Sequence, residues 1–196
     1  MEAEIMDLAL RNAARAREII EELDIVGAWR SIGAEANLVG SLRMGLMMKH
    51  RDIDFHVYSS PLAVADSFVA VARIAANPHV MEITFRNLAD TDEHCFEWHA
   101  FYRGEDGELW QLDMIHILRG SFYDGYFERM ADRISAVMTD EMREAVLRLK
   151  YQTPDDEKIM GVEYYRAVVE GGVRDMDSLR RWLAANPSQG VVEWIP

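Results

Sequence analysis

The sequence is most informative at Leu38-Val39-Gly40-Ser41-Leu42-Arg43-Met44-Gly45, which is followed after a short gap by Asp52-Ile53-Asp54. Polar and apolar residues alternate at the start of 52–58, and this alternation predicts a strand. Residues two apart on a strand point to the same face, so Asp52 and Asp54 should present two carboxylates side by side. Because unpaired like charges repel at that distance, the pair predicts a counter-charge. A divalent cation with oxygen ligands is the usual one, and one or two Mg²⁺ ions would fit.

A third acid, Asp113, lies in the middle of the otherwise apolar run 109–115. An acid in a buried strand is costly unless it is paired or bound to a metal. Neighbouring strands lie about 4.8 Å apart, so Asp113 could complete a cluster of three carboxylates if its strand lies beside the first. The alternatives are a solvated edge-strand face for Asp52 and Asp54, and a buried salt bridge for Asp113.

Gly40 and Ser41 end a short apolar strand at 37–39. A glycine lets the backbone approach a phosphate closely, and the following N–H groups and the serine hydroxyl can donate hydrogen bonds to it. Arg43 lies slightly further along and can pair with a phosphate oxygen through its forked guanidinium. A simple tight turn is the alternative, but it leaves the acids downstream unexplained.

These motifs resemble the signature of the DNA polymerase β-like nucleotidyltransferase superfamily: a hydrophobic residue and Gly-Ser, a gap, Asp-x-Asp, and a third acid on a later strand. The resemblance covers 36–58 closely and extends to the strand of Asp113. It implies transfer of a nucleoside monophosphate, usually AMP from ATP, to an acceptor hydroxyl with two Mg²⁺ ions. On this resemblance Gly40 and Ser41 hold the triphosphate and Arg43 contacts it. Asp52 and Asp54 bind both metals, and Asp113 binds the catalytic one and helps to deprotonate the acceptor. The gap 46–51 places Lys49 and Arg51 near the triphosphate, although its apolar character is unusual.

The pattern along the chain predicts an α+β fold, a nucleotidyltransferase-type mixed sheet flanked by helices with a C-terminal helical subdomain. Expected helices are 3–23 and 62–76, the second starting after Ser59-Ser60-Pro61. Three strands follow at 79–86, 94–103 and 108–118, the last two joined by a turn at 104–107. Further helices are expected at 122–137, 139–151, 155–170 and 176–185. We therefore expect a catalytic core at 1–120 and a helical subdomain at 121–196, which resembles the bundle of the antibiotic nucleotidyltransferases in architecture alone.

Several other polar residues have two interpretations. His56 follows Asp54 on the same strand face and either lines an acceptor pocket or is a hydrogen-bonded neighbour. Glu97 is a candidate base on the acceptor side, or part of an exposed hairpin face that it shares with His99. His116 should point away from Asp113 and be structural. Two helical lysines, Lys150 and Lys158, could reach a triphosphate, but solvated helix charges are the favoured interpretation for both.

Composition limits the partners. The net charge is −13, and no basic stripe that would grip a polynucleotide is found, so a long nucleic acid is not expected as substrate. A cationic small molecule with a hydroxyl group suits the charge better, with a protein acceptor as a third hypothesis. One cysteine, an acidic N-terminus and no long apolar run indicate a cytoplasmic chain with no membrane contact. The oligomeric state is left open, with a homodimer as one candidate. The main alternative function is a catalytically weak nucleotide-binding or regulatory module, or a toxin–antitoxin component on the same fold.

Overall fold

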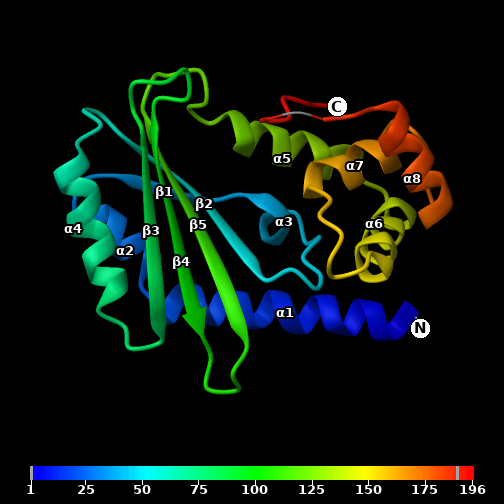
Figure 1. The fold of residues 1–196 in the computed structure, drawn as a ribbon, viewed down its shortest axis with the longest axis horizontal. Coiled ribbons are helices and arrows are strands. Elements are labelled where there is room, and N and C mark those ends of the chain that lie inside the picture. The colour runs from blue at the N-terminus through cyan, green and yellow to red at the C-terminus, as the bar shows by residue number, and fades with distance from the viewer. Residues whose placement is uncertain (1, 189) are drawn as a thin grey trace.

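A five-stranded mixed sheet forms the centre of the molecule (Figure 1), as the computed structural model of residues 2–188 and 190–196 shows. The strand order is β1-β2-β5-β4-β3. The strands are β1 (Glu35–Leu38), β2 (Asp52–Ser59), β3 (Val80–Leu88), β4 (Cys95–Arg103) and β5 (Leu109–Leu118). Only β2 and β5 run parallel, while the other neighbouring pairs are antiparallel. The predicted mixed sheet within an α+β fold is confirmed.

One face of the sheet packs on three helices and carries the larger apolar core. The helices are α1 (Glu2–Glu22), α2 (Ile25–Arg30) and α4 (Val64–Ala75). Alternate residues of β2, Ile53, Phe55 and Val57, enter this core and are at most 2% exposed. Each such side chain contributes about 1.5–3 kcal/mol of burial free energy. The strand is therefore held in place from one side, and its other side is left for polar residues.

The C-terminal part of the chain is helical, as predicted, and builds its own core. It contains α5 (Tyr126–Val137), α6 (Asp140–Gln152), α7 (Gly161–Val169) and α8 (Met176–Ala185), which Figure 1 shows to one side of the sheet. Thr139 begins α6 by accepting a hydrogen bond from the Met142 N–H at 3.2 Å, the role expected of an N-cap residue. The arrangement places α6 where its side chains can reach the sheet.

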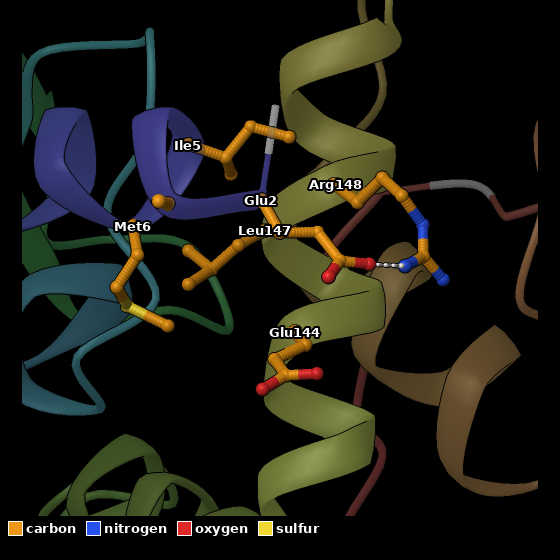
Figure 2. Close-up of a pocket in the computed structure, with 7 residues that line it drawn as sticks. Glu2, Ile5, Met6, Glu144, Leu147 and Arg148 are labelled. Atoms are coloured by element: carbon orange, nitrogen blue, oxygen red, sulfur yellow. Dashed lines mark hydrogen bonds and ion pairs between the residues drawn. The ribbon is translucent and has the colours of Figure 1, made fainter.

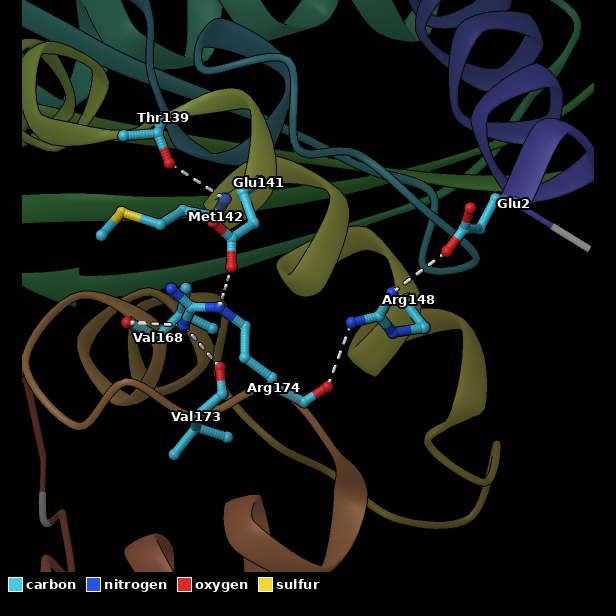
Figure 3. Close-up of polar contacts among 8 residues, drawn as sticks. All are labelled: Glu2, Thr139, Glu141, Met142, Arg148, Val168, Val173 and Arg174. Carbon is cyan, nitrogen blue, oxygen red and sulfur yellow. Dashed lines mark hydrogen bonds and ion pairs between the residues drawn. The ribbon is translucent and has the colours of Figure 1, made fainter.

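Helix α1 joins the two parts, because it runs beneath the sheet and on to α6 (Figure 1). Ile5 and Ala9 pack against Leu147 of α6. Figure 2 shows the beginning of α1 facing α6 across a cavity of about 210 Å³. Polar contacts continue this junction in Figure 3: Arg148 lies 3.5 Å from Glu2 and donates to the Arg174 carbonyl at 3.2 Å. The helical part is thus anchored to the N-terminal helix as well as to the sheet.

The apolar character of residues 46–48, the first part of the gap 46–51, has a structural explanation. Leu46 belongs to the helical core, Met47 to the core beneath the sheet, and Met48 to the cluster between α1 and α6. All three are at most 2% exposed. The segment therefore packs where three apolar clusters meet, which accounts for its unusual composition.

Three expectations about helices need correction. The six-residue helix α2 was not predicted, because it is short, contains Gly27 and is separated from α1 by Asp24 in a left-handed conformation (φ 46°). Helix α4 begins at Val64, later than expected from Ser59-Ser60-Pro61. Residues 155–160 are not helical, and α7 begins at Gly161, where Glu163 accepts from the Met160 N–H at 2.8 Å. Among the residues described, no helix is both long and apolar enough to cross a bilayer.

Candidate active site

The three aspartates of the sequence motif lie on the polar face of the sheet. Strands β2 and β5 are parallel neighbours, and Asp54 pairs in register with Asp113, while Asp52 pairs with Gln111. Burial, followed by the charges of Asp113 and Asp52, raises the pKa of Asp54 to about 7. Burial and Asp113 likewise raise the pKa of Asp52. The structure therefore brings Asp113 beside the other two, as the motif predicts.

Gly40 packs directly against this cluster. It adopts a left-handed conformation (φ +65°), and a Cβ atom at this position would lie 2.0 Å from Asp54 Oδ2. Strand β1 ends at Leu38, and the Val39 N–H donates to the Asp54 carbonyl at 2.9 Å. The Ser41 N–H donates to the Asp54 carboxylate at the start of the four-residue helix α3 (Gly40–Arg43), which lowers the Asp54 pKa in part. Only glycine allows both this turn and this close approach.

Asp113 is held in place by two neighbours. His99 Nδ1 lies 2.6 Å from Asp113 Oδ1, and the Gln111 amide donates to the same oxygen at 2.7 Å. His99 lies directly opposite Asp113 in the antiparallel pairing of β4 with β5. The sequence placed His99 beside Glu97 on one strand face but gave it no link to Asp113. That link depends on the register of the hairpin, which the composition of its turn does not define.

Lys150 of α6 brings a positive charge to the aspartates. Its ammonium donates to the Leu46 carbonyl and to the Tyr165 hydroxyl, both at 2.9 Å. Burial lowers its pKa to about 8, although Asp54 and Asp52 act in the opposite direction. The interpretation of Lys150 as a solvated helix charge is therefore wrong. One sequence signal favoured an inward position, because Lys150 follows the buried Val146 by four residues on the same helix face.

Arg43 and Lys49, which were also predicted to contact the phosphates, are already paired with acids of the helical part. Arg43 lies 2.6 Å from Asp132 of α5 and donates to the Leu38 carbonyl at 3.2 Å. Lys49 donates to Asp155 and to the Thr153 carbonyl, both at 2.7 Å. Helix α6 ends at this point because Thr153 precedes Pro154 and has an extended backbone (ψ 128°). Either cation would have to exchange partners to contact a phosphate.

His56 and Glu97 line a cavity further along the same sheet face. Burial lowers the pKa of His56 to about 4, and its Nδ1 has no hydrogen-bond partner within the described part of the chain. Glu97 lies 3.5 Å from Arg86. On the opposite face, His116 is fully buried with its ring nitrogens 2.8 Å from Ser59 Oγ and 3.1 Å from Ser67 Oγ. His116 is therefore structural, as its position in the alternation predicts.

The donor set of the aspartate cluster fits a hard divalent cation, since the negative charge of Asp113 raises the pKa of both Asp52 and Asp54. The side chains do not form a complete cage as they lie. In residues 2–188 and 190–196, no group of three or more His, Cys, Asp or Glu side chains is arranged to hold a metal ion. One reason is that Asp113 Oδ1 faces His99 and Gln111, which leaves Oδ2 as the oxygen available to a cation.

Comparisons with known proteins find the fold but no near relative. No family model matches the chain, and no curated protein does. A cytoplasmic RNA terminal U-transferase has a TM-score of 0.52 and 15% identity, over 84% of this chain and 50% of that one. The Cid1 RNA terminal uridylyl transferase has a TM-score of 0.57 and 16% identity, over 86% and 54%. The GLD-2–GLD-3 non-canonical poly(A) polymerase complex has a TM-score of 0.58 and 10% identity, over 95% of this chain and 59% of that one. The chain therefore spans about half the length of these solved structures, and it shares their fold.

Proposed function

We propose that this protein is an enzyme that transfers a nucleoside monophosphate, AMP from ATP, to a hydroxyl group with the help of Mg²⁺. The observation that carries the proposal is the parallel register that sets Asp54 beside Asp113, with Gly40 packed against the Asp54 carboxylate. Asp52, Asp54 and Asp113 would hold the metal. Magnesium bound there would offset the negative charge of the reacting phosphate and of the carboxylates themselves.

The surrounding residues have separate roles in this proposal. Gly40 and Ser41 offer a close backbone approach to the triphosphate, and Lys150 adds a half-buried cation beside the two acids of β2. Arg43 and Lys49 contribute once they exchange their present partners. The site then lies between a catalytic core at 1–120 and a helical subdomain at 121–196, because α6 supplies Lys150.

The chemistry is a displacement at the α-phosphorus of ATP. The acceptor oxygen forms a bond to this phosphorus, the bond to the pyrophosphate oxygen breaks, and pyrophosphate leaves. The proton of the acceptor hydroxyl passes to Asp113, which His99 and Gln111 hold in a fixed orientation. Positioning and charge stabilisation lower the barrier, and no covalent enzyme intermediate is formed.

Two acceptor classes have support. The net charge of −13 favours a small molecule over a polyanion, because a polynucleotide would be repelled. An RNA 3′ hydroxyl is the second candidate, because solved structures with this fold include RNA terminal uridylyl transferases and a poly(A) polymerase. A Cid1 structure bound to MgGTP also supports a magnesium–nucleotide complex as the donor.

The test is transfer of label from ATP labelled at the α-phosphate, with Mg²⁺, to a panel of hydroxyl compounds and to an RNA oligonucleotide. We expect a labelled product that requires Mg²⁺. Asp54→Asn and Asp52→Asn should each lower the rate by about 10³-fold or more, since each removes a group that stabilises the transition state. Asp156→Asn, which changes an exposed acid outside the site, is the matched control.

Turnover by Asp54→Asn at the rate of the control would refute the assignment. Binding of MgATP without product from any acceptor would instead favour a regulatory module that holds a nucleotide. The pairing of Arg43 and Lys49 with Asp132 and Asp155 is the feature that favours this second function.

A further inference from the structure

A cavity of about 140 Å³ lies on the polar face of the sheet, beyond the aspartates. Its walls come from β2, β4 and β5, from the loop before β4, from the start of α5 with the segment that leads into it, and from the C-terminal segment. They include His56, Cys95, Glu97, Ile115, Tyr123 and Phe127. A protein cavity of about 150 Å³ accepts a molecule of the size of benzene. The volume therefore suits a single six-membered ring.

The position of the cavity relative to the aspartates is defined by the strand register. His56 is two residues beyond Asp54 on β2, and Ile115 is two beyond Asp113 on β5, a step of about 7 Å. Strand β1 runs antiparallel to β2, so the chain that follows β1 advances from His56 towards Asp52. Gly40 and Ser41 therefore lie towards the end of β2 that begins with Asp52. The cavity and the glycine turn thus flank the aspartates on opposite sides.

This order matters for a displacement at phosphorus. The attacking and leaving oxygens lie roughly in line on opposite sides of the phosphorus atom. If the triphosphate is held at the glycine turn, pyrophosphate leaves on that side and the hydroxyl must approach from the other. The cavity lies on that other side.

The chemistry of the walls selects a ligand. His56 is 9% exposed, and its Nδ1 is buried with no hydrogen-bond partner in the part of the chain that the structure describes. An unpaired polar atom of this kind costs free energy that a ligand could recover. Its ring contacts Phe127 edge-on, with 4.9 Å between ring centroids.

The charge around the cavity is negative. Glu93 and Glu97 line it, and the Tyr123 hydroxyl donates to Glu193 at 2.7 Å. Arg86 lies 3.5 Å from Glu97 with its side chain 69% exposed, and it offsets only part of this charge. Aromatic walls with nearby carboxylates favour a cation over a neutral or anionic group.

We propose that this cavity binds the acceptor, and that the acceptor is a hydroxyl compound with a ring-sized head carrying a protonated amine. This inference rests on the proposed function, because it takes the triphosphate to lie at Gly40 and Ser41. Glu97 determines specificity by pairing with the amine. The hydroxyl of the acceptor then points along the sheet towards Asp113.

The experiment compares two matched pairs of acceptor probes: glucosamine with glucose, and 2-aminocyclohexanol with 1,2-cyclohexanediol. Binding to the full chain is measured by calorimetry, and transfer is measured with labelled MgATP. We expect the amine of each pair to be preferred about tenfold, which corresponds to one charged hydrogen bond. Glu97→Gln should reduce this preference to within about twofold, whereas the exposed Glu105→Gln, the matched control, should retain it.

A second variant tests the cavity itself. Ile115→Phe narrows the space at a partly exposed side chain, and it should abolish amine binding while the affinity for MgATP stays within about twofold. Equal use of both members of each pair by the wild type, or an unchanged preference in Glu97→Gln, overturns the inference. Transfer to an RNA oligonucleotide that Ile115→Phe leaves intact overturns it as well. Absence of MgATP binding to the wild type refutes the proposed function instead, and calorimetry with the amines still decides what the cavity binds.

Discussion

The two faces of strand β2 differ completely, although their residues alternate along a single segment. On one face Ile53, Phe55 and Val57 are at most 2% exposed and belong to the apolar core over α1, α2 and α4. On the other face Asp52 and Asp54 repel each other and Asp113. The comparison shows that the apolar residues of β2 stabilise the strand, and that the acids next to them in the sequence provide its chemistry. Burial of the apolar face offsets the cost of gathering the carboxylates.

Ile53→Ala should produce the largest loss of stability on this strand. Ile53 is completely buried, and truncating such a side chain removes buried apolar area and leaves a cavity. We expect the free energy of unfolding to fall by about 2–5 kcal/mol, as measured by urea denaturation. Transfer per folded molecule should stay close to that of the wild type. A loss of activity in molecules that are still folded would mean that the two faces are not independent.

Gly40→Ala tests how closely the turn approaches the acidic face. The left-handed conformation alone costs a non-glycine residue about 1–2 kcal/mol. The added Cβ would also lie 2.0 Å from Asp54 Oδ2, so the carboxylate or the turn must move. We expect a fall of about 2–3 kcal/mol in the free energy of unfolding, together with weaker MgATP binding. Gly33→Ala is the matched control, since Gly33 also has a positive φ (+77°) but its Cβ would meet no atom within 4 Å. If Gly40→Ala and Gly33→Ala changed the affinity for MgATP equally, Gly40 would matter only for its backbone conformation.

The local pattern of the sequence predicted much of the sheet, because alternation and turns are properties of neighbouring residues. Alternation and turn residues alone were enough to predict the strand at 52–58 and the hairpin around 104–107. The position of Asp113 beside Asp54 was a conditional prediction, since it depends on β5 joining β2 across a long stretch of chain. Local patterns favour strands but do not define which of them become neighbours.

The features that the sequence could not predict depend on contacts between distant segments. The helix face of Lys150 favours an inward position, but only the packing of α6 against the gap segment shows that the lysine lies beside Asp54. The link from His99 to Asp113 needs the exact register of β4 and β5. The cavity beside His56 combines three strands with the start of α5 and the C-terminal segment. Its existence follows from packing, which no single motif encodes.

Asp54→Asn should have the smallest effect on stability, and that effect should depend on pH. The pKa of Asp54 is about 7 in the folded protein and about 4 in an unfolded chain. The folded state therefore binds more protons over this range, and the wild type loses stability as the pH rises from about 4 to 7. Asparagine carries no charge, so the variant should match the wild type at about pH 4 and exceed it at pH 9. Because Asp54 is only partly shielded from solvent, we expect a gain of about 1–2 kcal/mol.

Measuring both proteins at each pH isolates Asp54 from other buried groups. His56 and His116, whose pKa values are lowered to about 4, reduce stability as the pH falls below 6.5, and they do so in both proteins. Lys150 has a pKa of about 8, so at pH 9 it is mostly neutral and loses no counter-charge when Asp54 is replaced. Added Mg²⁺ should restore the stability of the wild type at pH 9 and leave Asp54→Asn unchanged. A variant that is less stable than the wild type at pH 9 would show that the carboxylate of Asp54 stabilises the fold, which contradicts the division between the two faces of β2.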